Sequence, residues 1–169
     1  MSLRSLIERH FPKLVEAGYV QTSPMDSSYN CIAFTLGDQD RWWWPPVYGK
    51  GLVSYWPPGA PVQETVEAFA EMYALYEFET CPSLEAEDGY VKVAIFAEAK
   101  EGLPAHAALQ LPGGRWISKM WDQEDIAHTL EGLEGPPHYF RVSRVLKCRM
   151  AKAPAGLRKL LGRYGVFVP

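Results

Sequence analysis

Cys31 and His106 are the two side chains whose types and contexts favour covalent chemistry. Asn30 is a good helix N-cap residue and an apolar run begins at Cys31, so we predict that Cys31 opens a helix. A helix N-terminus and a nearby imidazole both lower the pKa of a thiol. His106 is the candidate imidazole, because cysteine enzymes commonly bring these groups together from separate elements. Asn30 and the first N–H groups of the helix are candidates for binding an oxyanion.

The strand predicted after His106 supplies a candidate third member. The turn signal at 112–114, Pro-Gly-Gly, predicts a hairpin that returns the chain past His106. Ser118 on the returning strand can accept a hydrogen bond from the imidazole and so fix its tautomer. Trp116 and Lys119 lie on the same strand and are candidates for contacts to a substrate.

These residues also have a purely structural interpretation. Free cysteine is among the most buried residue types, so Cys31 can be a core residue, and His106 can be a core or edge residue of its strand. The other two cysteines, Cys81 and Cys148, are predicted to be structural. Three cysteines form neither a small disulfide framework nor a paired metal motif, and we predict no metal site and no cofactor.

The stretch 37–61 is rich in Trp, Tyr, Pro and Gly and has neither helix nor strand periodicity. Its aromatic residues are Trp42, Trp43, Trp44, Tyr48, Tyr55 and Trp56. They are candidates for the wall of an apolar or sugar-binding cleft beside Cys31, since ligand pockets are often lined in this way. The alternative is that they pack a long loop onto the sheet.

The remaining patterns predict an α+β fold. Helical spacing is found over 5–18, with a break or kink at Pro12, and over 63–78. Short β-rich runs at 91–98, 105–111 and 115–120 predict three antiparallel strands. The rest of the chain predicts a short helix over 125–133, a strand over 139–150 and a small basic helix over 157–161.

Composition limits the function classes. The 169 residues, 47% of them hydrophobic, fit a single domain over 1–169. A net charge of −3 argues against nucleic acid as a partner, and the lack of long apolar runs argues against a membrane span or a secretory signal. We expect a cytoplasmic protein that acts on a small molecule or a peptide, and the oligomeric state stays open.

Several strings carry a resemblance to a known family: YNCIAF, DRWWWP, YWP, VKVAIFAE, HAALQLPGGRWISKM and EDIAHTL. They resemble a bacterial domain family of unknown function in which an Asn-Cys helix start, a Trp-Pro loop, a His-Ala-Ala strand and a Trp-x-Ser-Lys strand recur. The resemblance covers about residues 29–135. Trp121 stands where that family tends to carry glycine.

At a looser level, NCIAF followed by HAALQLPGGRWIS resembles the papain-like superfamily, especially its peptidoglycan-hydrolase branch. This resemblance implies N-terminal helices packed on a small antiparallel sheet. It also implies that Cys31 is the nucleophile, His106 the base and Ser118 the orienting residue. The serine departs from the His, Asn, Asp or Gln usual at that third position.

Three functions follow as hypotheses. The first is a cysteine-dependent enzyme that acts on an amide or thioester, as a hydrolase, deamidase or acyltransferase, through Cys31 and His106. The second is a lyase or cyclase that acts on an apolar biosynthetic intermediate, with His106 as general acid or base and no covalent step. The third is a noncatalytic binding module.

Overall fold

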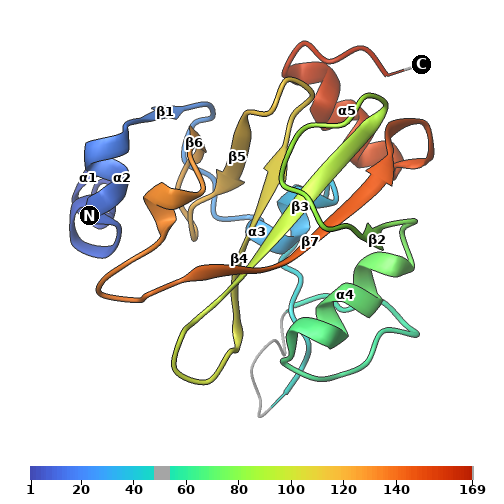
Figure 1. The fold of residues 1–169 in the computed structure, drawn as a ribbon, viewed down its shortest axis with the longest axis horizontal. Helices are drawn as coiled ribbons and strands as arrows, with labels where there is room; N and C mark the ends of the chain where they lie inside the picture. Colours follow the sequence, from blue (N-terminus) through green and yellow to red (C-terminus); the bar gives the residue numbers. More distant parts are fainter. Residues whose placement is uncertain (48–53, 169) are drawn as a thin grey trace.

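The computed structural model describes residues 1–47 and 54–168; Tyr48 of the aromatic loop lies outside them. In this part of the chain, seven strands form one antiparallel sheet in the order β1-β6-β5-β4-β3-β7-β2 (Figure 1). The strands are β1 (Tyr19–Gln21), β2 (Glu79–Thr80), β3 (Tyr90–Ala97), β4 (Pro104–Gln110), β5 (Trp116–Lys119), β6 (Asp125–His128) and β7 (Arg141–Arg149). The α-helices are α1 (Leu3–His10), α2 (Pro12–Ala17), α3 (Cys31–Thr35), α4 (Val66–Ala74) and α5 (Ala155–Arg163), and 3-10 turns span Glu131–Leu133 and Met150–Lys152. The predicted α+β mix is confirmed.

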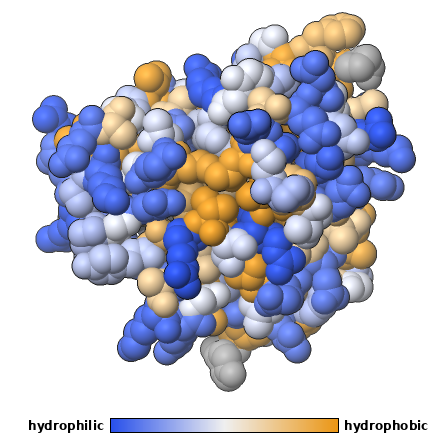
Figure 2. All heavy atoms as spheres, in the orientation of Figure 1, coloured by the Kyte–Doolittle hydropathy of each residue, from blue (hydrophilic) through white to orange (hydrophobic). Residues whose placement is uncertain are grey.

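The sheet separates two apolar cores, because successive strand residues point to opposite faces. On one face, α3, α4 and α5 pack on β3 and β4 residues such as Val93 and Leu109. On the other face, α1 and α2 pack on residues such as Phe96 and Ala108. On the side of the molecule drawn in Figure 2, apolar residues gather near the middle and hydrophilic ones surround them. No helix within the described ranges is long and apolar enough to cross a membrane.

The N-terminal helix is divided, as its proline suggested. α1 ends at His10, and Pro12 occupies the first turn of α2, where its missing N–H costs no intrahelical hydrogen bond. Phe11 forms the junction and is buried. The break turns the chain so that both short helices cover the same face of the sheet.

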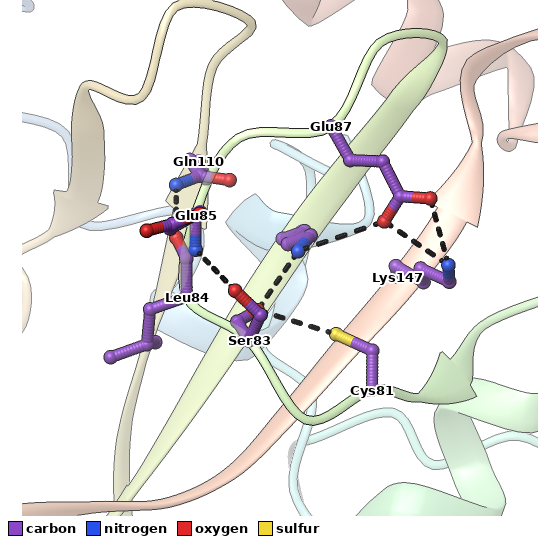
Figure 3. A network of polar contacts seen from close by, with 8 residues as sticks. Cys81, Ser83, Leu84, Glu85, Glu87, Gln110 and Lys147 are labelled. Carbon is purple, nitrogen blue, oxygen red and sulfur yellow. Dashed lines mark hydrogen bonds and ion pairs between the residues drawn. The ribbon is translucent and has the colours of Figure 1, made fainter.

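The segment 81–88 is held across β3, β4 and β7 by polar contacts (Figure 3). Lys92 is buried and donates a hydrogen bond to the Ser83 carbonyl at 2.8 Å. Gln110 donates to the Leu84 carbonyl at 2.6 Å. These bonds give hydrogen-bond partners to two polar side chains that are buried on the strands. They also attach the segment 81–88 to the sheet, so we assign this segment a structural role.

The prediction of a helix over 125–133 is wrong. Residues 125–128 form β6, which pairs with β1 on one side and β5 on the other, and only the last part is helical, as a 3-10 turn. Ile126, Leu130 and Leu133 do have helical spacing, and all three are buried in the same core. Tertiary pairing with two neighbouring strands decided the conformation here.

Candidate active site

The site lies where β4 and β5 separate. β4 pairs with β3 along most of its length, but its pairs with β5 are Leu109↔Ile117 and Gln110↔Trp116, both at its C-terminal end. The N-terminal half of β4, which carries His106, therefore has no β5 partner. α3 packs against both β4 and β5.

A cavity of about 310 Å³ opens at this separation. Its lining residues are Phe11, Asn30, Cys31, Trp42, Trp44, Ser54, Ala105, His106, Met120, Trp121 and Phe140. They come from both faces of the sheet: Cys31 belongs to the core beneath α3, whereas His106 lies on the face of Phe96, its partner on β3. The cavity thus brings together two residues that a continuous sheet would have kept apart.

Cys31 is the first residue of α3, as predicted. Asn30 is the N-cap: its side-chain oxygen accepts hydrogen bonds from the Ala33 N–H at 3.2 Å and the Trp43 N–H at 3.1 Å. Its amide nitrogen donates to the Trp43 carbonyl at 2.9 Å. These bonds attach the aromatic loop to the N-terminus of α3. Asn30 therefore has a structural role in holding the helix start, and with it Cys31, in place.

The Cys31 thiol is protonated in the free protein. Burial raises its pKa to about 11, and the backbone N–H groups of Ala107 and Ile32 offset only part of that rise. The Ala107 contribution places the sulfur against β4, one residue along the chain from His106. No hydrogen bond joins the Cys31 and His106 side chains, both of which the structure describes.

His106 is 8% exposed, and its Nε2 atom is buried without a hydrogen-bond partner. Burial, together with the nearby His128, lowers its pKa to about 3, so the imidazole is neutral at physiological pH. Its ring lies 5.8 Å from the ring of Phe96. A buried polar atom left unpaired costs stability and calls for an explanation, and here it belongs to a residue that lines the cavity.

The expected hydrogen bond from His106 to Ser118 is corrected by the structure. Ser118 does face the same side of the sheet as His106, but its hydroxyl lies 2.6 Å from Nε2 of His128. Nδ1 of His128 lies 2.9 Å from the Thr129 carbonyl, which can only accept. Nε2 of the neutral ring therefore accepts from Ser118, which orients His128. No side chain within the described ranges takes the orienting role for His106.

Trp116 and Lys119, predicted to contact a substrate, do not line the cavity. Trp116 is buried in the core beneath α1 and α2. Lys119 donates hydrogen bonds to the carbonyls of Asp26 and Gln123. Its ammonium also lies 4.3 Å from the centre of the Tyr29 ring. Both residues are corrected to structural roles.

The aromatic loop combines the two roles proposed for it. Trp42 and Trp44 line the cavity. Trp43 is buried in the core, where Tyr55 packs on it at 4.7 Å between ring centres. Trp56 packs on Phe69 at 5.1 Å. Only two of the described aromatic residues of this loop are therefore placed to contact a ligand.

Three aromatic residues of the cavity lie outside the predicted set of substrate-binding residues, although the resemblance had placed Trp121 at the rim of the site. Phe11 comes from the junction of α1 and α2, and Phe140 from the residue before β7. Trp121 follows β5 and has φ 51°, a left-handed conformation that favours glycine. Glycine would adopt this conformation without strain, and the glycine that the resemblance implies at this position was the only signal in the sequence for this wall.

The polar groups at the site do not form a cluster of metal ligands. Among the residues that the structure describes, no group of three or more His, Cys, Asp or Glu side chains is placed to hold a metal ion.

A family model described as Domain of unknown function (DUF7689) matches residues 20–147. The chain belongs to this family. The matched range of the DUF7689 domain includes every cavity residue except Phe11. Comparisons with curated proteins and with solved structures gave no match. The family finding confirms the closer resemblance seen in the sequence, whereas the papain-like arrangement stays a prediction.

Proposed function

We propose that this DUF7689 protein is a cysteine-dependent enzyme that acts on an amide or thioester. The observation that carries the proposal is that Cys31 and His106 line one cavity while His106 Nε2 is buried without a partner. A thiol and an imidazole that keeps an unpaired basic nitrogen, both on the wall of one cavity, are the minimal equipment for acyl transfer. The looser papain-like resemblance of the same two residues supports the same reaction class.

In the proposed reaction, His106 accepts the thiol proton as the Cys31 sulfur attacks the substrate carbonyl carbon. The tetrahedral oxyanion collapses, the C–N or C–S bond breaks, and the leaving amine or thiol takes the proton from His106. The acyl group is then a thioester on Cys31. Water or another nucleophile, deprotonated by His106, attacks this thioester, and the departing sulfur recovers the proton.

The raised thiol pKa and the lowered imidazole pKa make the free enzyme a neutral pair. Ionisation of either group alone in the buried site is unfavourable, because each charge would lack a partner. Proton transfer between the two creates opposite charges that stabilise each other. We therefore expect the thiolate to form only when a bound substrate brings the two side chains together. On this mechanism the free enzyme does not need an ionised Cys31.

The decisive experiment is Cys31→Ala, compared with Cys148→Ala. Both cysteines are buried, and burial raises the pKa of each to about 11, but Cys148 does not line the cavity. Cys31→Ala is expected to abolish labelling by a chloroacetamide probe at this site and to lower turnover of amide or thioester substrates by about 10³-fold or more. Cys148→Ala is expected to retain turnover. Retained turnover in Cys31→Ala would remove the covalent mechanism.

A second candidate is a lyase or cyclase in which His106 is a general acid or base and no covalent bond forms. The absence of a Cys31–His106 hydrogen bond and the pKa of the thiol near 11 favour it. The two candidates differ in the weight of each residue. His106→Ala is severe in both, whereas Cys31→Ala is mild only in the second.

A further inference from the structure

The described part of the cavity wall carries no formal charge. No Asp, Glu, Lys or Arg occurs among the lining residues that the structure describes, and the only polar side chains are those of Asn30, Cys31, Ser54 and His106. A charged group transferred from water into this cavity would find no opposite charge to pair with, which is strongly unfavourable. The lining therefore selects against a charged acyl group.

Five of the eleven lining residues are Phe or Trp, and they come from separate parts of the chain. Trp42 donates its indole N–H to the Ser27 carbonyl at 2.8 Å, so this ring offers only apolar surface to a ligand. Trp44 packs edge-on against Phe69, with ring centres 5.0 Å apart. Each ring is held by a contact outside the cavity, so the wall is preorganised rather than assembled around a ligand.

On the opposite side, Phe11 packs against Trp121 at 5.4 Å and against Phe140 at 5.8 Å. Trp121 adopts its left-handed conformation, with φ 51°, at a conformational cost that glycine would avoid. Its indole packs on the rings of His10 and Phe11, each at 5.4 Å between ring centres, and the residue keeps 38% of its surface exposed. A strained aromatic residue at the wall of a ligand cavity is a candidate for recognition of that ligand.

We infer that the cavity takes the acyl part of a neutral substrate, that this part is an aromatic group of one or two rings, and that Trp121 determines this preference. The inference rests on the proposed function for the identity of the reaction and names the class of substrate. An apolar cavity of about 150 Å³ holds benzene, so the volume of about 310 Å³ is suited to one or two rings. Trp121 lines the cavity and is 38% exposed, so its indole has surface on which such a ring can stack.

Binding is tested in the Cys31→Ala protein, so that no covalent chemistry contributes. The probes are 2-naphthamide, which is neutral, and 6-carboxy-2-naphthamide, which carries a carboxylate on the same rings. Isothermal titration calorimetry is expected to give a Kd for the neutral amide at least tenfold lower than for the charged one. Equal binding of the two amides, or no binding of the neutral one, would overturn the inference.

Trp121→Gly, added to Cys31→Ala, isolates the role of the indole, because glycine suits the backbone at this position. It is expected to raise the Kd for 2-naphthamide at least tenfold, and Trp121→Phe to restore most of the binding. Tyr139→Gly is the matched control, since Tyr139 is also an exposed aromatic residue with positive φ (52°) but does not line the cavity. An unchanged Kd in Trp121→Gly would refute the role of Trp121.

The outcome is separable from that of the proposed function. If wild-type protein turns over no amide or thioester while Cys31→Ala binds the neutral amide selectively, the substrate class stands and the covalent reaction fails. If wild-type protein turns over a charged substrate through Cys31 and 2-naphthamide does not bind, the reaction stands and the substrate class fails. If Trp121→Gly does not fold, the comparison of the two amides decides on its own.

Discussion

His106 and His128 lie on the same face of the sheet with nearly the same exposure, 8% and 7%, yet their surroundings differ in one respect. Both ring nitrogens of His128 are hydrogen-bonded: Nε2 accepts from the Ser118 hydroxyl, and Nδ1 donates to the Thr129 carbonyl. Nε2 of His106 has none. Equal burial with unequal hydrogen bonding separates a histidine that is bound into the fold from one that lines the cavity and keeps an unpaired ring nitrogen.

The same contrast extends to the regions around them. Near β5 and β6, buried Lys119 bonds to backbone carbonyls, and Tyr29 donates a hydrogen bond to the Asp125 carboxylate at 2.9 Å. At the cavity, neither the thiol of Cys31 nor the imidazole of His106 has a side-chain partner among the described residues. We therefore propose that the β5–β6 region contributes stability and that the open end of β4 is the functional region, and the following predictions test this division.

The largest effect on stability is expected from Lys119→Ala. This change removes the positive charge that acts on the Asp125 carboxylate, which is 2% exposed, and it leaves the Asp26 carbonyl without its described donor, whereas the Gln123 carbonyl still accepts from the Asp26 N–H. Removing one partner of a buried charged network costs about 3–5 kcal/mol. Urea unfolding followed by circular dichroism would measure the loss, with the exposed Lys159→Ala as a control expected to change little. A loss near zero would show that the region does not carry stability.

The next effect is acid destabilisation by the two buried histidines. Folding lowers the pKa of His106 to about 3 and that of His128 to about 4, from 6.5. The unfolded chain therefore binds these protons first, so stability is full above about pH 6.5 and falls as the pH drops toward the folded values. From pH 7 to pH 5 the loss is about 2 kcal/mol for each histidine.

Urea unfolding at pH 7, 6 and 5 measures this loss. His106→Gln is expected to remove about half of the pH-dependent part, because glutamine does not titrate. If His106→Gln and wild type lose the same free energy between pH 7 and pH 5, the buried neutral state assigned to His106 is wrong.

Ser118→Ala is expected to have the smallest effect of the three. It leaves Nε2 of His128 without its donor at a fully buried position, at a cost of about 1.5 kcal/mol. Turnover by the Cys31 site is expected to persist, since Ser118 does not contact His106. Ser143→Ala, at an exposed strand position, is the control for stability. Complete loss of turnover in a folded Ser118→Ala protein would return Ser118 to the catalytic group.

Local signals were sufficient where the chain's neighbours in sequence determine the structure. Asn30 followed by an apolar run predicted a helix that begins at Cys31, and the turn at 112–114 predicted the β4–β5 hairpin. Both depend on short-range hydrogen bonds that the sequence makes visible. The helix predicted over 125–133 failed because pairing with β1 and β5, distant in the sequence, outweighed its helical spacing.

The sequence by itself determined the class of fold and membership of the family, and it singled out Cys31 and His106 as candidates, because each rests on residue types and on local spacing. Only the tertiary structure showed that β4 and β5 separate and that Ser118 forms its hydrogen bond with His128. It also showed that Phe11 and Trp121 line the cavity. These features depend on which side chains meet across elements far apart in the chain. Strand register and side-chain packing determine these contacts. The spacing of residues within a single segment predicts neither of them.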